Sequence, residues 1–196
     1  MIIQAAINGF GADAIAGNTA AANFEYFNFY FVSGFAQTAV TFVSQNYGAG
    51  DVTRCRRATR LCVIAGMTLS LVFLGIILLF ADFFLGLYSP DPAVIEYGMI
   101  RFKYLVSMHF LIGTYEIVAG SLRGFGYSMT PTIISVIGTC VIRPVWVATV
   151  FKAIGTMPSL LIVYPVSWVV TGIAMVTAYF FALKRIRKKA ASEHLI

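Results

Sequence analysis

Glu116 is the residue whose type and position most plainly suggest chemistry. It lies in the stretch Tyr115–Pro131 (YEIVAGSLRGFGYSMTP), which joins two long apolar runs, and it falls just inside the first of them. An ionised carboxylate in the hydrocarbon of a bilayer costs about 3 kcal/mol on insertion scales, and more in simulations. We therefore expect Glu116 to face protein or water, about two helical turns from a short basic membrane-surface turn at Arg123–Gly126.

A second group of polar side chains lies on a run from about Asn18 to Asn46, which is unusually polar for a segment long enough to cross a membrane. At about 100° per residue, several of them share one stripe of a helix: Tyr26, Tyr30, Ser33, Gln37, Thr41 and Ser44. The stripe is expected to face a partner helix or a water-filled cavity rather than lipid, and for its hydroxyl residues ordinary helix packing is favoured. Glu25 and Asn28 lie on a neighbouring face, where the carboxylate needs a partner or a function.

Other ionisable side chains also fall inside apolar runs. His109 and Glu116 are seven residues apart on one predicted helix, so they share a face, but about 10 Å of rise separates them. They could relay a proton only through water or another side chain. Arg143 precedes Pro144 in the next run, where pairing with a carboxylate or reaching the membrane surface is favoured over contact with an anionic ligand.

Apolar helices are the elements that must position these residues. Of the 196 residues, 59% are hydrophobic and 11% are charged, against about 25% charged in soluble domains. This composition predicts an all-α, polytopic membrane helix bundle. Residues 1–11 look helical but have about half of the ~20 residues that a span needs, so they predict a truncated first helix. About five full transmembrane helices follow, at residues 18–46, 58–81, 93–120, 130–151 and 158–183.

The basic residues predict the orientation of the bundle. The net charge is +6, and most basic residues fall in Arg54–Arg60 and Lys184–Lys189, at the ends of apolar runs. Positive charge collects on the cytoplasmic side of membrane proteins, so we expect a multi-pass protein of the inner (plasma) membrane with a cytoplasmic C-terminus. Residues 1–184 are predicted to form the membrane domain and residues 185–196 a basic cytoplasmic tail. The expected partner is the lipid bilayer and not nucleic acid.

The remaining motifs favour neither a metal site nor a cofactor. Cys55, Cys62 and Cys140 are odd in number and lack the spacing of metal ligands. The stretch Tyr47–Asp51 (YGAGD) lacks the spacing of a phosphate-binding loop, and it predicts instead the end of one helix and an aspartate that caps the next. Because no nucleophile accompanies a base, we expect a protein that is not an enzyme and has no catalytic residue.

Three stretches together resemble the multidrug and toxic compound extrusion (MATE) family of cation-coupled exporters. They are TFVSQNYGAGD at residues 41–51, GSLRGFGYSMTP at residues 120–131 and YPVSW at residues 164–168. Each is weak alone, and their order and spacing carry the resemblance. It covers essentially the whole chain, but it matches only the second half of the family's twelve-helix fold, which has two lobes of six helices.

This resemblance implies an antiporter that exports small organic, often cationic, compounds in exchange for protons or sodium ions. Its two lobes would rock around a central cavity, so the missing N-terminal lobe is an implied partner. On this chain, the residues implied to line the cavity or bind a cation are Glu116, Glu25, Asn28, Tyr30, Gln37, Tyr115 and Tyr26. The family's first-helix coupling aspartate belongs to the absent lobe, and the position of Glu116 suits a subgroup of the family.

Two alternatives stay open at this point. One is a lipid-linked oligosaccharide flippase of the same superfamily, which is expected to have a more basic cavity than Arg143 and Arg101 provide. The other is an inactive truncated fragment, because Met1 falls inside a predicted helix and a single lobe cannot alternate access without a second one.

Overall fold

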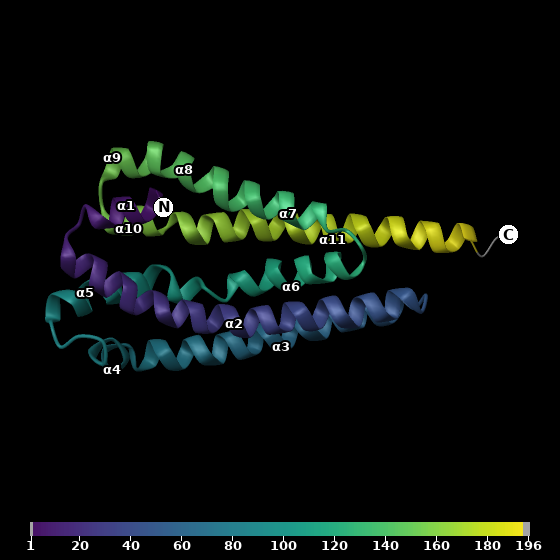
Figure 1. Cartoon of the computed structure of the whole chain (residues 1–196), viewed down its shortest axis with the longest axis horizontal. Coiled ribbons are helices and arrows are strands. Elements are labelled where there is room, and N and C mark those ends of the chain that lie inside the picture. The colour runs from purple at the N-terminus through teal and green to yellow at the C-terminus, as the bar shows by residue number, and fades with distance from the viewer. Residues whose placement is uncertain (1, 194–196) are drawn as a thin grey trace.

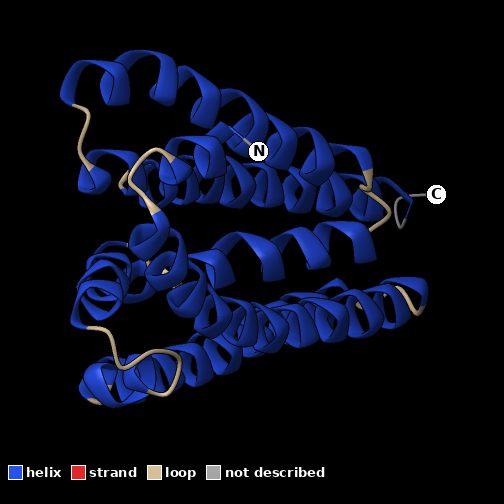
Figure 2. Cartoon of the chain, turned by 60° about the vertical axis from the view of Figure 1, so that its left-hand side comes forward, coloured by secondary structure: helices blue, strands red, loops and turns tan. Residues whose placement is uncertain are grey.

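The described part of the chain is built from helices. The computed structural model describes residues 2–193, and within that range it holds helices and turns but no strand (Figure 2). This confirms the predicted all-α class. In chain order the elements are α1 (Ile2–Asn8), α2 (Ala12–Gly48), α3 (Val52–Leu79), α4 (Ala81–Gly86), α5 (Pro92–Tyr104), η1 (Val106–Met108), α6 (Leu111–Gly124), α7 (Met129–Val136), η2 (Ile137–Val141), α8 (Ile142–Trp146), η3 (Val147–Phe151), α9 (Lys152–Ile154), α10 (Met157–Leu161) and α11 (Val163–Glu193).

The long helices form two groups that run along a common axis (Figure 1). In one group α2 and α3 form an antiparallel hairpin, and α6 lies along both of them. In the other group the segment from α7 to α9 runs antiparallel to α11. Because α6 also packs against α11, it joins the two groups, and most of its residues are buried.

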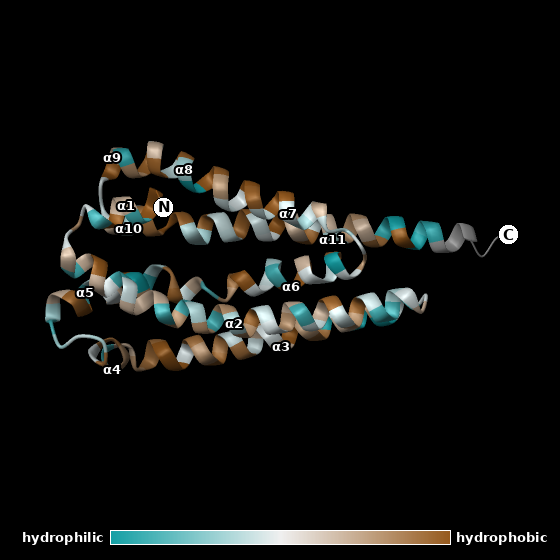
Figure 3. Ribbon diagram, in the orientation of Figure 1, coloured by the Kyte–Doolittle hydropathy of each residue, from teal (hydrophilic) through white to brown (hydrophobic). Residues whose placement is uncertain are grey.

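Several helices have the length and apolarity of membrane spans. Three segments meet both requirements, namely Val52–Leu79, Met129–Ile154 and Met157–Lys189. A fourth span forms if Pro92–Met108 and Leu111–Gly124, which meet at a bend of 44°, cross together. α2 has 37 residues and is long enough to cross, but its polar side chains keep it out of this set (Figure 3). The described residues therefore form a membrane helix bundle.

The turn between α2 and α3 confirms the predicted glycine stop and aspartate cap. Gly50 has a φ of 77°, which lets the chain reverse, and the Asp51 carboxylate accepts a hydrogen bond of 2.9 Å from the backbone nitrogen of Arg54. α3 consequently begins at Val52, earlier than the predicted residue 58. Its first turns therefore carry the arginines that the sequence placed before it.

One end of the bundle collects the basic residues. The α2–α3 turn, the α6–α7 turn and the last turns of α11 all lie at the same end, where the α11 ribbon becomes hydrophilic (Figures 1 and 3). The tail predicted to start at residue 185 continues α11 without a break to Glu193. Residues 194–196 of that predicted tail lie outside the described residues.

Small residues let α6 approach α2 closely. A Cβ on Gly120 would collide with the backbone carbonyl of Ala36, and a Cβ on Gly124 would lie 2.8 Å from the Cβ of Val43. Backbones that approach this closely gain van der Waals contact along their length, which drives helix association in membranes. Glycine is therefore required at these two positions by packing and not by backbone conformation.

Replacing Gly120 by alanine should destabilise the bundle, although alanine is the better helix former. We expect Gly120→Ala to lower the free energy of unfolding by about 1–3 kcal/mol, because the new methyl group must push α6 away from α2. The matched control is Gly34→Ala on exposed α2 surface, where a Cβ meets nothing within 4 Å. This control should leave stability unchanged or raise it by up to about 1 kcal/mol. Unfolding in detergent, followed by circular dichroism, would measure both, and equal effects would contradict the account.

Candidate functional site

A buried ion pair lies between α2 and α5. The guanidinium of Arg101 donates to both carboxylate oxygens of Glu25, from Nε to Oε1 at 2.6 Å and from Nη2 to Oε2 at 2.8 Å. Each side chain is only 8% exposed. A third donor, Nη1, reaches Oδ1 of Asn18 at 2.5 Å. The planar guanidinium is therefore held by a bidentate pair and a further hydrogen bond, which is the strongest geometry for such a contact.

Glycine positions the two helices that carry this pair. A Cβ on Gly17 of α2 would lie 2.8 Å from the backbone nitrogen of Gly98 of α5, so only glycine permits this approach. Gly17 and Asn18 are consecutive in α2, and Arg101 follows Gly98 by one helical turn. The close crossing thus brings the charged side chains into contact within the bundle.

His109 adds a titratable ring to the ion pair. Its Nδ1 lies 2.9 Å from the side-chain nitrogen of Asn28, which can only donate, so Nδ1 is the acceptor. The proton of the neutral ring is then on Nε2, which lies 3.9 Å from Oε2 of Glu25. The ring packs edge-on against Trp168 of α11, with a centroid distance of 5.2 Å. Oδ1 of Asn28 is buried and has no hydrogen-bond partner among the described residues.

Tyr164 links this cluster to a second arginine. Its ring lies 5.8 Å from the guanidinium carbon of Arg101 and 4.4 Å from that of Arg143. Arg143 also donates from Nε to Oγ of Ser167 at 3.3 Å. The predicted pairing of Arg143 with a carboxylate is not found among the described residues, where its contacts are the ring of Tyr164 and the hydroxyl of Ser167.

A cavity of about 550 Å³ adjoins the cluster at Arg143 and Tyr164. The other lining residues come from α1 and the α7–α8 region and include Gln4, Thr139 and Cys140. The cavity therefore has both polar and apolar walls, and one of its lining residues is Tyr164, whose ring contacts Arg101. We refer below to Asn18, Glu25, Asn28, Arg101, His109, Arg143, Tyr164 and Trp168 as the charged cluster.

Glu116 lies apart from the charged cluster. Its Oε1 is 3.5 Å from Nη2 of Arg123, two turns later on α6, and its side chain is 20% exposed. The contact is single and long, and the Arg123 side chain is itself 34% exposed. Glu116 is therefore less constrained than Glu25, whose two oxygens are both occupied.

The seven residues that the sequence singled out fall into separate places. The structure brings Glu25 and Asn28 together around His109. Tyr115 is 8% exposed and belongs to the apolar core. Tyr26 and Tyr30 are 61% and 68% exposed, and Gln37 is exposed on the same side of α2. The predicted polar stripe is thus a largely exposed face that does not pack within the described residues.

The predicted common face of His109 and Glu116 is wrong. The sequence suggested one helix over residues 93–120, but α5 ends at Tyr104 and α6 starts at Leu111, with a short 3-10 turn between them. This break turns His109 toward Asn28 and Glu25, and it leaves Glu116 on a different axis. A proton relay between His109 and Glu116 along one helix face is therefore not available.

Sequence reasoning did not identify Arg101, Asn18, His109 and Trp168 as members of one cluster. Arg101 was noted as a basic residue near the outer part of its run, which is also where a side chain reaching the interface is found. The usable signal was charge balance, because Glu25 and Arg101 are opposite charges in separate predicted spans. Two such charges in hydrocarbon are expected to find each other.

Removing one partner of the buried pair should destabilise the fold strongly. We expect Arg101→Met to lower the free energy of unfolding by about 3–5 kcal/mol, because Glu25 would keep a buried charge without compensation. Arg54→Met removes an arginine whose contact with Asp51 is exposed, and it should change stability by at most about 1 kcal/mol.

Adding Glu25→Gln to Arg101→Met should restore most of the loss, since the uncompensated charge disappears. Urea or thermal unfolding of the single and double variants in detergent gives the coupling between the two side chains. Independent, additive effects of the two substitutions would show that they do not form a pair.

Comparison with known proteins identifies the family to which this chain belongs. The sequence profile of the MatE family matches residues 1–149. A protein of Thermotoga maritima named "Probable multidrug resistance protein NorM" is 30% identical over 131 residues, which are 65% of this chain and 27% of that protein. "Multidrug resistance protein PmpM" of Pseudomonas aeruginosa is 27% identical over 124 residues, 63% of this chain and 26% of that protein. The matched region thus spans about a quarter of each relative's length. The chain belongs to the multidrug and toxic compound extrusion (MatE) family and corresponds to part of one lobe.

Proposed function

We propose that this chain forms part of one lobe of a secondary transporter that exports organic, often cationic, compounds in exchange for protons or sodium ions. Its family and the multidrug resistance names of its relatives support drug transport. The observation that carries the proposal is the charged cluster, in which Glu25 is buried and which borders a cavity through Arg143 and Tyr164. A carboxylate buried in a membrane bundle is a place where a coupling cation can compete for the negative charge. Transport itself requires a second lobe, against which this lobe moves.

In this proposal the coupling ion competes with Arg101 for Glu25. Both oxygens of Glu25 are engaged by the guanidinium, so a proton or sodium ion reaches Glu25 only when Arg101 withdraws. The ring of Tyr164 already lies 5.8 Å from the guanidinium carbon of Arg101, and a cation–π contact of this kind, worth about 0.5 to 2 kcal/mol, would help to hold the guanidinium when the ion pair opens. Ion exchange at Glu25 would then depend on a shift between α2 and α5, which links ion occupancy to helix movement.

Glu116 is the second carboxylate that we propose to change protonation or ion occupancy. It is partly exposed and held by one long contact, so an ion can reach it without breaking a buried pair. Glu116 and Glu25 lie on different helices, and we propose that each exchanges its proton or ion at a different stage of the transport cycle. Asn28 holds His109 against Glu25, and Tyr115 lies in the core, so we assign both a supporting role.

The exposed face of α2 is the part of this lobe that we propose contacts the exported compound. Tyr26 and Tyr30 present aromatic rings there, and Gln37 adds an amide about two turns beyond Tyr30. Aromatic faces attract organic cations, and an exposed row of them suits a mobile, lipophilic substrate. In a two-lobe protein this face would look toward the central cavity.

We place the basic end of the bundle on the cytoplasmic side of the inner (plasma) membrane. The gathering of the basic turns and the last part of α11 at one end supports this orientation. The lipid bilayer and the second lobe are then the lasting partners of the chain. The flippase alternative gains no support, because Arg101 is occupied by Glu25 and cannot also meet a pyrophosphate group.

Neutralising Glu116 should stop export without affecting expression. In a two-lobe transporter that contains this segment, we expect Glu116→Gln to reduce efflux of an ethidium-type dye to background, because the site can no longer exchange its charge. The matched control is Glu96→Gln, which removes an exposed carboxylate from α5 and should leave efflux unchanged. Dye efflux from energised vesicles would measure both. Full efflux by Glu116→Gln would exclude Glu116 as a coupling residue.

A further inference from the structure

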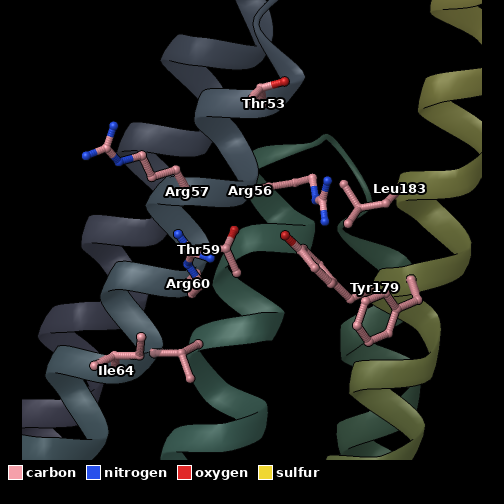
Figure 4. A pocket seen from close by; sticks show the side chains of 10 residues that line it. Thr53, Arg56, Arg57, Thr59, Arg60, Ile64, Tyr179 and Leu183 are labelled. Atoms are coloured by element: carbon pink, nitrogen blue, oxygen red, sulfur yellow. The ribbon is translucent and has the colours of Figure 1, made fainter.

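A groove between α3 and α11 lies at the basic end of the bundle. α3 and α11 both pack on α6, which forms the floor between them. The groove has a volume of about 500 Å³ and is lined by Thr53, Arg56, Arg57, Thr59, Arg60, Val63, Ile64, Tyr179, Phe180 and Leu183 (Figure 4). A smaller hollow of about 190 Å³ continues it along α11 and adds Lys184 and Arg187.

The groove has a cationic end and an apolar end. Arg56 and Arg60 are one helical turn apart on α3, so they project from one face, and Arg187 approaches from α11. Ile64 and Phe180, deeper in the bundle, are 55% and 61% exposed. A ligand that fills both ends must therefore carry a negative group and a long apolar part.

The side chains are arranged toward the groove and not merely spread around the helix. In Figure 4 the guanidinium of Arg56 reaches across toward Leu183 of α11, whereas that of Arg57 points away from α11. The phenol oxygen of Tyr179 points into the space between Arg56 and Thr59. A hydroxyl group thus lies beside the guanidinium at the position where the two helices face each other.

The arginines of the groove have no carboxylate partner among the described residues. Arg54 pairs with Asp51, and Arg123 pairs with Glu116, but no ion pair involves Arg56, Arg60 or Arg187. Within the described residues, the groove therefore concentrates positive charge that no carboxylate balances.

We propose that this groove binds one anionic phospholipid. Its phosphate group lies between Arg56 and Arg187, within reach of the Tyr179 hydroxyl, and its acyl chains lie along Ile64 and Phe180. Basic pockets between membrane helices favour acidic headgroups in this way. A soluble phosphate would use the cationic end alone and leave the apolar walls uncovered, so a lipid is the better fit.

Native mass spectrometry of the full chain in detergent tests the proposal, with palmitoyl-oleoyl phosphatidylglycerol as the probe and the phosphatidylcholine analogue as its zwitterionic comparison. We expect one phosphatidylglycerol to be retained in preference to phosphatidylcholine. Arg56→Gln together with Arg187→Gln should weaken this binding by about tenfold or more. Arg56→Lys with Arg187→Lys should keep most of it, because the positive charge remains.

The matched control is Arg54→Gln with Lys188→Gln, which removes the same charge from the same two helices but from positions that do not line the groove. The affinity of this control for phosphatidylglycerol should stay within about twofold of that of the unmodified chain. If the lipid were held only by a general attraction to surface charge, both double variants would bind it equally weakly. An equal fall would overturn the proposal, and so would equal retention of the two lipids. Displacement of the lipid by millimolar inorganic phosphate would assign the groove to a soluble anion and would also overturn it.

Discussion

The bidentate ion pair between Glu25 and Arg101 sets how one half of the lobe is assembled. Either charge alone would lose several kcal/mol on leaving water, so α2 and α5 must hold both side chains within hydrogen-bond distance. Gly17 permits the close crossing that this requires, and the break before α6 lets His109 approach the same carboxylate. The close helix packing, the bend of 44° and the charged cluster thus act together to bury the Glu25 carboxylate in a membrane bundle.

Three regions of the lobe differ in what they leave unsatisfied. The charged cluster is closed around Glu25, and among its fully buried side-chain polar atoms in the described chain only Oδ1 of Asn28 lacks a hydrogen-bond partner. The exposed stripe of α2, which carries Tyr30, has polar and aromatic groups that no other helix of the described chain covers. The groove at Arg56 has positive charge without a counter-ion in the described part of the chain. These differences are the basis for the three roles proposed above, namely a site for a coupling ion, a face for the exported compound and a site for a lipid.

The apolar runs predicted the helices well, because a backbone in hydrocarbon must satisfy its hydrogen bonds internally. The turn at Gly50 and the cap at Asp51 were also predictable, since their chemistry is local. The break at residues 105–110 was not, because that stretch contains neither proline nor glycine and its shape follows from contacts of His109 with other helices. The pairing of Glu25 with Arg101 likewise depends on which helices meet, and periodicity along a single helix does not reveal it.

The most direct test of this account is the charge of Glu25 in the membrane. Infrared difference spectra of the full chain in lipid bilayers, with and without Glu25→Gln and with isotope-labelled glutamate, would resolve its carboxyl vibrations near neutral pH. The account predicts that the substitution removes an ionised carboxylate band, shifted by its bond to the guanidinium of Arg101, and no protonated carboxyl band. Loss of a protonated carboxyl band instead would show that Glu25 is neutral and would contradict the ion pair.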